Sequence, residues 1–400
     1  MFSKRTNWRL EENAYTRALH RRRASGKPIL DLTVSNPTAC GFQYDEAAIL
    51  AALAAPAALR YDPEPKGLLK ARAAVAQYYH EKNSEAHVDL ERLILTTGTS
   101  EAYSFLFRLL CEPDDEIVIA QPSYPLFEFL AAIHDVKLRP FHLVYDHGWQ
   151  IDFAALTKAA TPRTRAIVLV HPNNPTGHFV SRSEAEELRG LCLEREIALV
   201  IDEVFVDYKV PVADTRQKQG SFAFDGRALT FVVSGLSKIA GLPQMKIGWI
   251  AAAGPDALVR DAIARLEIIA DTYLSLNAPV QHALPTLLAQ RGATQPQIMR
   301  RIEENLHTLD ENLERQKLVS RLEVEGGWCA VLRVPAVQPD EELAIRLLED
   351  YSVLAHPGHF YDFPDDGYLV VSLLTPVEEF GEGIRAIIQC VDATNREKVR

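Results

Sequence analysis

The chain has 400 residues and a net charge of −11, from 43 basic and 54 acidic side chains. Hydrophobic residues make up 47% and charged residues 24%, so a large core can form and global disorder is excluded. The acidic balance argues against nucleic acid as a partner, because binding it requires a basic face. The length fits two domains better than one.

The cysteines are far apart and form no CxxC pair, which argues against a zinc site and against a secreted disulfide framework. No apolar run approaches the ~18 residues that a membrane span needs. The N-terminus lacks the apolar core of a signal peptide. We therefore expect a cytoplasmic protein that binds neither nucleic acid nor a membrane.

The first part of the chain predicts helices separated by irregular segments. The expected elements are helices over 7–25, 45–59 and 68–82 and a short strand over 29–34. Ser25-Gly26 followed by Lys27-Pro28 ends the first helix. Residues 60–67 hold two prolines and a glycine, which excludes regular structure there.

From Leu93 onward, apolar runs alternate with helical segments, a pattern typical of a parallel sheet with helical crossovers. The predicted strands cover residues 93–97, 117–120, 137–143, 166–170, 198–202, 229–233 and 247–251. The predicted helices between them include 100–111, 124–134, 152–158 and 183–195. Continuous apolar runs indicate strands that are buried on both faces.

The last third predicts a long charged helix over about 280–317, followed by a unit that mixes strands and helices. Its expected elements are strands over 328–333 and 368–373 and helices over 340–350 and 376–390. The predicted fold is therefore α/β, with a mostly parallel seven-stranded sheet covered by helices in a large domain (45–285). A smaller α+β domain would combine both chain ends (1–44 and 286–400), joined by the long helix.

Three predicted strands run into polar residues that could meet at one ligand. Strand 166–170 precedes Asn173-Asn174-Pro-Thr-Gly, strand 198–202 ends in Asp202-Glu203, and strand 229–233 runs into Ser234-Gly-Leu-Ser237-Lys238. Ligands of open α/β sheets bind just beyond the carboxyl ends of the strands. Burying an ammonium is costly without partners, so we expect Lys238, Asp202 and Asn174 to converge on one ligand. Glu203 should face another surface, because neighbours on a strand alternate.

These segments resemble the markers of class I/II pyridoxal-phosphate aminotransferases, the aspartate aminotransferase-like enzymes of fold type I. Ser237-Lys238, with Lys246 eight positions later and then Gly248-Trp249, resembles the family's lysine signature. The asparagine turn and the Asp202 segment resemble its two other markers, in the same order. The resemblance spans roughly residues 30–375. It implies a homodimeric transaminase with pyridoxal 5'-phosphate as its cofactor. Such an enzyme exchanges an amino group between an amino donor, here expected to be an amino acid, and a 2-oxo acid by a ping-pong mechanism.

The resemblance gives catalytic roles to Lys238, Asp202 and Tyr124. Lys238 would hold the cofactor and then move a proton, which requires a lowered pKa or an aldehyde already bound. Asp202 would pair with the cofactor's protonated pyridine nitrogen, the cation that a buried carboxylate needs. Asn174 would donate to the ring oxygen, and Tyr124 would stack on the ring.

The segment from Thr97 to Ala102 joins a predicted strand to a helix start, where free N–H groups and the helix dipole favour a phosphate. The further predicted cofactor-binding residues are Gly98, Thr99, Ser100, Phe205, Ser234, Ser237, Lys246 and, reaching the neighbouring subunit, Tyr61. Ser35 and Asn36 are predicted to approach the substrate. His356 and His359 are spaced like a metal pair, but their Pro-Gly turn favours a structural role, and no metal is expected.

Three positions depart from the family's pattern. Lys246 replaces an arginine, so a bidentate phosphate clamp becomes a point charge. Phe205 replaces a tyrosine that donates to the ring oxygen. Val370 stands where an arginine binds the substrate carboxylate. Either another group replaces this arginine or the donor is not held by an α-carboxylate; the candidate groups are Lys246, Arg333 and the backbone of Ser35 and Asn36.

Two other functions are compatible with parts of this pattern. A lyase or decarboxylase that uses the same cofactor could share the scaffold, because a fold does not fix a reaction. The cofactor-sensing domain of a transcription regulator would need a DNA-binding module as well. The ~30 residues before the first predicted strand are too few for such a module.

Overall fold

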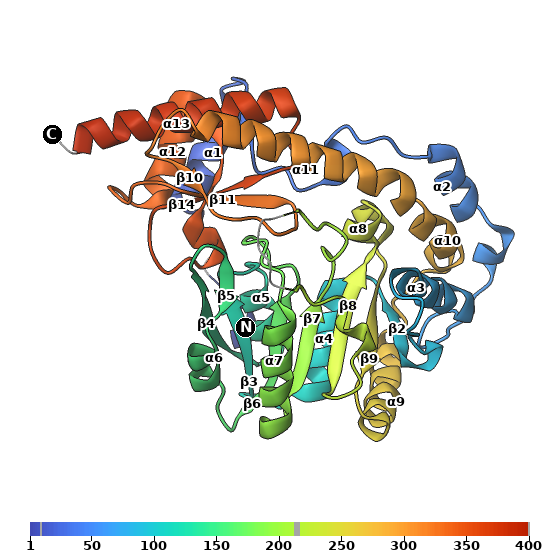
Figure 1. The fold of residues 1–400 in the computed structure, drawn as a ribbon. Coiled ribbons are helices and arrows are strands. Elements are labelled where there is room, and N and C mark those ends of the chain that lie inside the picture. Colours follow the sequence, from blue (N-terminus) through green and yellow to red (C-terminus); the bar gives the residue numbers. More distant parts are fainter. Residues whose placement is uncertain (9, 212–216, 399–400) are drawn as a thin grey trace.

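The computed structural model describes residues 1–8, 10–211 and 217–398. Position 9 of the first predicted helix and positions 399–400 of the predicted small domain lie outside these ranges. Figure 1 shows a large sheet flanked by helices, with a second group of strands and helices above it. None of the described helices combines the length and the apolar character needed to cross a bilayer.

The α-helices are α1 (Ala14–Ala24), α2 (Glu46–Leu53), α3 (Leu69–Lys82), α4 (Thr99–Leu110), α5 (Phe127–Ile133), α6 (Phe153–Ala159), α7 (Arg182–Arg195), α8 (Leu236–Ile239), α9 (Asp256–Tyr273), α10 (Ala278–Ala289), α11 (Arg291–Leu313), α12 (Asp340–Tyr351) and α13 (Val377–Lys398). The strands are β1 (Leu30–Asp31), β2 (Leu93–Thr96), β3 (Glu116–Gln121), β4 (Lys137–Tyr145), β5 (Trp149–Ile151), β6 (Thr164–Val170), β7 (Ala198–Asp202), β8 (Thr230–Gly235), β9 (Gly248–Ala253), β10 (Ser320–Arg321), β11 (Cys329–Arg333), β12 (Val353–Leu354), β13 (His356–Pro357) and β14 (Tyr368–Ser372).

The large sheet has eight strands in the order β2-β9-β8-β7-β6-β3-β4-β5. Strands β4, β3, β6, β7 and β8 run parallel, whereas β9 and β5 run antiparallel to their neighbours. The seven predicted strands are all present. The eighth, β5, has only three residues, too few to show a period in the sequence.

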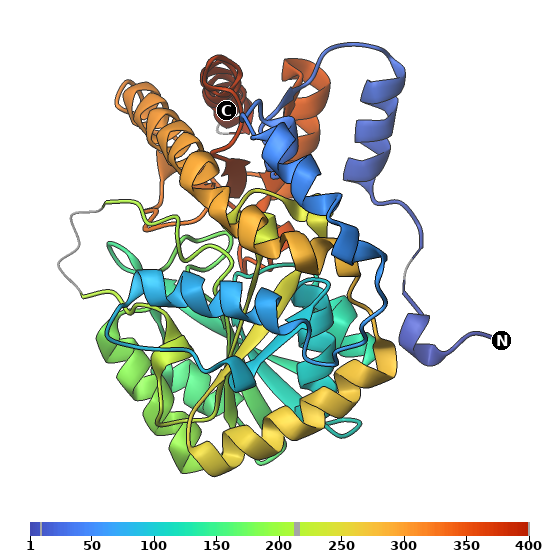
Figure 2. The same ribbon diagram turned by 90° about the vertical axis from the view of Figure 1, so that its right-hand side faces the viewer.

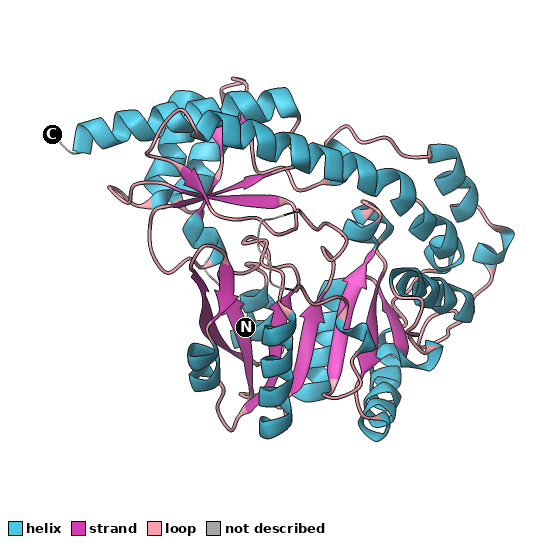
Figure 3. Ribbon diagram, in the orientation of Figure 1, coloured by secondary structure: helices cyan, strands magenta, loops and turns pink. Residues whose placement is uncertain are grey.

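Helices cover both faces of this sheet, as Figure 3 shows. Successive side chains of β6 enter different cores: Ile167 and Leu169 belong to one buried cluster, and Val168 and Val170 belong to the other. Such alternation follows from the two-residue period of a strand. The prediction of strands buried on both faces is confirmed.

The second group of strands forms a four-stranded sheet in the order β10-β11-β14-β13. The N-terminal segment packs beside this sheet: β1 and β12 form a separate two-stranded parallel sheet, and α1 packs on α12. The Tyr15 hydroxyl donates to the carbonyl of Ala355 at 2.9 Å, and its ring packs with Leu348 and Leu354. Figure 2 shows this side of the molecule. The two chain ends therefore meet, as predicted.

Four predicted helices differ clearly from the structure. The first begins at Ala14 rather than at residue 7, because the side chain of Asn13 accepts from the Thr16 N–H and caps it there. The helix expected over 45–59 is α2, which ends at Leu53; Pro56–Leu59 form a separate 3-10 helix, because Pro56 has no N–H to continue the helical hydrogen bonds.

The helix expected over 376–390 continues to Lys398 as α13. The long helix expected over 280–317 is divided into α10 and α11. The N–H of Gln290 donates to the carbonyl of Leu287, three residues back, which tightens the last turn of α10 and ends it.

Candidate active site

Strands β6, β7 and β8 are adjacent and parallel, so their carboxyl ends lie at one edge of the large sheet. Asp202 is the last residue of β7. Lys238 lies in α8, the short helix directly after β8, and Asn174 lies in the turn after β6. The topology therefore brings the ends of the three predicted marker segments to one edge.

The Lys238 side chain is partly buried and lies beside two aromatic rings. Its Nζ lies 4.8 Å from the ring centre of Trp328 and 5.7 Å from that of Phe205. Burial lowers the pKa of Lys238, and the negative charge of Asp202 counteracts this only in part. The Tyr208 hydroxyl donates to the Lys238 carbonyl at 2.5 Å and fixes the backbone. The lowered pKa shifts Lys238 toward the neutral amine, the form that attacks a carbonyl carbon.

Asp202 is buried with 7% of its surface exposed. Its Oδ2 accepts from the Tyr103 hydroxyl and its Oδ1 from the Val204 N–H, both at 3.1 Å. Because both donors are neutral, burial dominates and raises the pKa of Asp202 to about 6. Glu203 faces the other surface, as predicted, and accepts from Ser221 and the Phe222 N–H. Asp202 is suited to a ligand that brings a positive charge.

The two neighbouring asparagines have different surroundings. The Asn173 Oδ1 accepts from the Thr176 hydroxyl at 2.9 Å and holds the turn together. The Asn174 side chain points instead toward Cys329, whose Sγ lies 3.8 Å from its Oδ1. Since the Lys238 charge also acts on the Cys329 thiol, Asn174 and Lys238 border the same space.

Glycines bring three backbones together beside Lys246. A methyl group on Gly248 would lie 2.8 Å from the Ser234 carbonyl oxygen and 3.0 Å from the Gly98 Cα. Gly98 is the N-cap of α4, with φ +157°, and the Lys246 Nζ lies 3.8 Å from the point where its Cβ would be. The Ser234 hydroxyl is buried and has no hydrogen-bond partner among the described residues. A helix N-terminus with a cation and a buried hydroxyl suits a phosphate.

The remaining predicted cofactor residues in these segments lie nearby in the chain. Thr99 and Ser100 form the first turn of α4, and Ser237 precedes Lys238 in α8. Tyr124 is 41% exposed, and its pKa is raised first by burial and then by the charge of Asp202, which places its phenol near that carboxylate. The Tyr124 ring packs edge-on against Phe127 at 6.3 Å.

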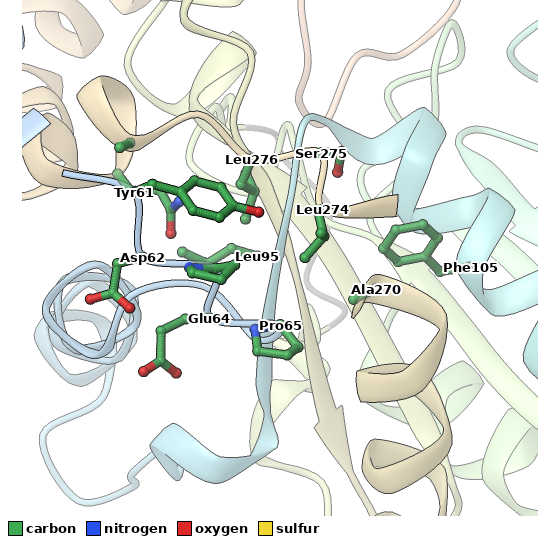
Figure 4. Close-up of a pocket in the computed structure, with 13 residues that line it drawn as sticks. Tyr61, Asp62, Glu64, Pro65, Leu95, Phe105, Ala270, Leu274, Ser275 and Leu276 are labelled. Atoms are coloured by element: carbon green, nitrogen blue, oxygen red, sulfur yellow. The ribbon is translucent and has the colours of Figure 1, made fainter. Parts of the chain in front are cut away.

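Tyr61 lies apart from this group. Its side chain is 78% exposed and lines a surface pocket with Leu95, Leu274 and Leu276, which Figure 4 shows. The other residues that line this pocket do not include the predicted cofactor residues of the same chain.

The predicted substrate residues follow β1. Ser35 and Asn36 are exposed, and the Asn36 Oδ1 accepts from the Thr38 N–H and hydroxyl, which holds its side chain in a turn. The Ser372 hydroxyl donates to the carbonyl of Val34 at 2.5 Å. This bond connects the segment to β14, the strand that carries Val370.

The groups that we expect to take the role of the family's arginine lie in different places. Val370 is 2% exposed, in the buried cluster that also contains Val331 and Leu169. Lys246 lies beside Gly98, in the part of the site that is suited to bind a phosphate. The Arg333 guanidinium is on the exposed rim, 5.6 Å and 5.8 Å from the ring centres of Tyr145 and Tyr368.

Several residues of the site were not predicted. Tyr103, Tyr208, Trp328 and Cys329 come from α4, the segment after β7 and the start of β11. Their sequence surroundings carry no motif, and the only signal was the predicted strand at 328–333. His356 contacts Tyr361 rather than His359, with 3.1 Å between its Nδ1 and the Tyr361 hydroxyl oxygen. The described residues contain no group of three or more side chains suited to hold a metal ion.

Comparisons with known proteins agree with this geometry. The alanine aminotransferase of Mycobacterium tuberculosis is 28% identical over 356 residues, which cover 86% of this chain and 81% of the relative. The glutamate-pyruvate aminotransferase of Escherichia coli is 26% identical, covering 87% of each chain. The solved alanine aminotransferase of Pyrococcus furiosus is 22% identical and has the same fold, with a TM-score of 0.88 over 98% of this chain and 100% of that one.

The family model for aminotransferase class I and II matches residues 27–387, nearly the whole chain. This match agrees with the motifs at Asn174, Asp202 and Lys238 and with the mostly parallel sheet that positions them. The family implies pyridoxal 5'-phosphate as the cofactor. The chain belongs to the class I and II aminotransferases and is a transaminase.

Proposed function

We propose that this chain holds pyridoxal 5'-phosphate on Lys238 and exchanges an amino group between a small amino acid and a 2-oxo acid. The observation that carries the proposal is that Lys238 and Asp202 lie near each other at the carboxyl ends of adjacent strands. A partly buried lysine of lowered pKa lies close enough to the buried carboxylate of Asp202 for each charge to affect the other. The names of the relatives favour alanine or glutamate as donor and pyruvate as an acceptor.

The described residues fit the cofactor. Asp202 supplies the negative charge for its pyridine nitrogen, Asn174 an amide for its ring oxygen, and Tyr124 a ring to stack on it. Gly98, Thr99, Ser100, Ser234, Ser237 and Lys246 would hold its phosphate. When bound, the cofactor acts as an electron sink for the substrate's Cα.

The role of the protein's own side chains in proton transfer follows from the surroundings of Lys238. Phe205 and Trp328 lie beside the Lys238 Nζ, and burial lowers the pKa of this amine, which favours its acting as the base that accepts a proton from the substrate and returns it. Phe205 donates no hydrogen bond, so Asn174 alone of these two residues can donate to the ring oxygen. Ser35 and Asn36 would approach the substrate from the segment after β1.

We also propose a homodimer in which Tyr61 reaches the neighbouring cofactor site, supported by its exposed position away from its own chain's site. Sedimentation of the loaded protein tests this, since a mass near the 44.7 kDa of one chain would exclude it. The division into 45–285 and 1–44 with 286–400, and the cytoplasmic location, stay predictions.

The test of the proposed function is chemical. Borohydride reduction of the protein loaded with pyridoxal 5'-phosphate should fix the cofactor on Lys238, as found by peptide mapping. L-alanine or L-glutamate should then convert the cofactor of unreduced protein to its amine form in equal molar amount. An adduct on another lysine would contradict the assignment. Release of ammonia or carbon dioxide without the amine form would instead indicate a lyase or decarboxylase.

A further inference from the structure

Val370 lies in the middle of a row of side chains that crosses three strands of the small sheet. It pairs with Val331 of β11 on one side and with His356 of β13 on the other. Side chains of directly paired residues lie on one face, with Cβ atoms roughly 5 Å apart. Val370 and Val331 belong to the buried cluster that also holds residues of the large sheet. His356 is therefore the polar neighbour of the position that lacks the family's arginine.

His356 is joined to a phenol. Its Nδ1 lies 3.1 Å from the Tyr361 hydroxyl oxygen. The carbonyl of Tyr361 accepts from the Ser123 N–H at 2.9 Å, which fixes Tyr361 beside the segment that carries Tyr124. Tyr361 and Cys329 both pack against the buried cluster that contains Val370. Burial raises the pKa of Tyr361, and the Cys329 thiol and the Tyr124 phenol raise it further, so both groups lie within electrostatic range of it. The Tyr361 phenol thus borders the space between Lys238, Asn174 and Tyr124.

We propose that Tyr361, oriented by His356, hydrogen-bonds the carboxylate of the substrate in place of the arginine that Val370 replaces. The inference rests on the proposed function, because it assigns a role to residues of that same site. When the Nδ1–H of His356 donates to the phenol oxygen, the phenol's own proton remains available for a carboxylate. A hydrogen bond from a hydroxyl to a carboxylate is charge-assisted and stronger than a neutral one.

The two cationic candidates for this role are placed less favourably than Tyr361. Arg333 pairs with Tyr368, one row farther out on the same face, and its guanidinium stacks on two rings at the exposed rim. Lys246 lies beside Gly98, where a phosphate would bind. Tyr361, a neutral hydrogen-bond donor, contacts His356, which is the direct strand partner of Val370. Tyr361 also lies near Tyr124.

The experiment compares two donors that differ only in the carboxylate: L-alanine and ethylamine. The dissociation constant of each is measured from the spectral change of the protein loaded with pyridoxal 5'-phosphate. Tyr361→Phe should raise the constant for L-alanine about 10- to 100-fold, as expected for a lost hydrogen bond to a charged group. The constant for ethylamine should change less than about twofold, because this donor presents no carboxylate.

His356 is tested as a positioning residue. His356→Ala should weaken L-alanine binding about tenfold, the effect of one misdirected hydrogen bond. His356→Asn should restore most of the affinity, since its amide N–H can take the place of Nδ1–H. His359→Asn is the matched control, because this exposed histidine of the same turn should leave both constants unchanged.

Each outcome decides the inference. Unchanged L-alanine affinity in a loaded Tyr361→Phe protein overturns it and leaves the proposed function standing. A loss that appears in Arg333→Ala but not in Tyr361→Phe assigns the carboxylate to the guanidinium and also overturns it. An equal loss for both donors shows a structural effect and overturns it too. Wild-type protein that never takes up the cofactor overturns the proposed function, and this inference with it.

Discussion

At the scale of single residues, Asp202 stands out because its burial disfavours its own charge. It is 7% exposed, its hydrogen-bond donors are neutral, and its pKa is raised to about 6. A carboxylate in such a place weakens the fold of the cofactor-free chain at neutral pH. Its position is explained by a ligand that supplies the missing positive charge.

We predict that Asp202→Asn makes the cofactor-free protein more stable at pH 8, by on the order of 2 kcal/mol. Because its pKa is raised in the folded state, Asp202 lowers the stability of the wild type as the pH rises. Its contribution to the free energy of unfolding is fully present below about pH 4 and is lost as the pH rises through about 6. The asparagine has no such titration and can still bond Tyr103 and Val204. Urea unfolding of both proteins between pH 4 and 8 measures the difference in stability, which should grow up to about pH 6 and then level off.

The same variant should bind pyridoxal 5'-phosphate at least tenfold more weakly, because the charge opposite the pyridine nitrogen is gone. A cofactor-free variant that is less stable than the wild type at pH 8 would contradict the prediction. So would a stability advantage that shrinks as the pH rises.

The residues at strand ends could be predicted from sequence, because an apolar run that stops at a polar residue marks both the strand and its edge. Lys238, Asp202 and Asn174 have this signal. Tyr103, Trp328 and Tyr361 do not, because their place depends on how α4 and the small sheet pack on the large one. The row that links Val370 to His356 depends on strand register, which no local pattern in this sequence specifies.

At the scale of elements, the close approach of β2, β8 and β9 shapes the end of the site that we propose holds the phosphate. Gly235 of β8 pairs with Gly248 of β9, and a methyl group on either would meet backbone atoms at 2.8 Å. Gly248 also packs against Gly98, the N-cap of α4. The absence of side chains here lets the start of α4 lie next to Ser234 and Lys246.

We predict that Gly248→Ala lowers the free energy of unfolding by about 1–3 kcal/mol, the usual effect of overpacking. It should also weaken binding of pyridoxal 5'-phosphate at least tenfold, because the methyl group displaces Gly98 from the cradle. The matched control is Gly190→Ala in the middle of α7, where a Cβ meets no atom within 4 Å. That control should gain about 0.5–1 kcal/mol and keep its cofactor affinity. Equal affinity in the two variants would exclude the proposed cradle.

Element boundaries were predictable where capping or periodicity is strong and not elsewhere. The helix expected at 183–195 appears as α7, which Ser181 and Glu184 start with a reciprocal capping box. The division of the region 280–317 was not predictable, because the break at Gln290 involves no glycine or proline at that position. Strand β5 is defined by its antiparallel hydrogen bonds to β4, a tertiary contact that no local sequence pattern indicates.

At the scale of the whole molecule, a buried charged cluster connects the two sheets. Glu325 lies in the segment that leads into β11, and its carboxylate accepts from the Phe179 N–H at 2.7 Å and pairs with Lys218. His178 lies between Glu325 and Glu184, 3.5 Å and 3.3 Å from their oxygens. This cluster holds the segment before Trp328 and Cys329 against the turn that carries Asn174.

The protonation of the cluster follows from its charges. Burial alone would raise the pKa of Glu325, but His178 and Lys218 together outweigh it and hold that pKa below its usual value. Glu184 responds to His178 in the same way, and its pKa falls to about 2. Burial lowers the pKa of His178, but the two carboxylates outweigh burial and raise it. The carboxylates therefore contribute stability above their ordinary pKa of about 4.3 and lose it as the pH falls.

We predict that Glu325→Gln lowers the free energy of unfolding by about 3 kcal/mol at pH 6, because it removes the negative charge beside two buried cations. The difference from the wild type should shrink as the pH falls below about 4.3, where the wild-type carboxylate also loses its advantage. Urea unfolding across this range measures it, with Glu323→Gln as the control two residues away, expected to change stability by less than about 0.5 kcal/mol. A loss in Glu325→Gln no larger than in this control, or one that grows toward low pH, would show that the cluster does not hold the two sheets together.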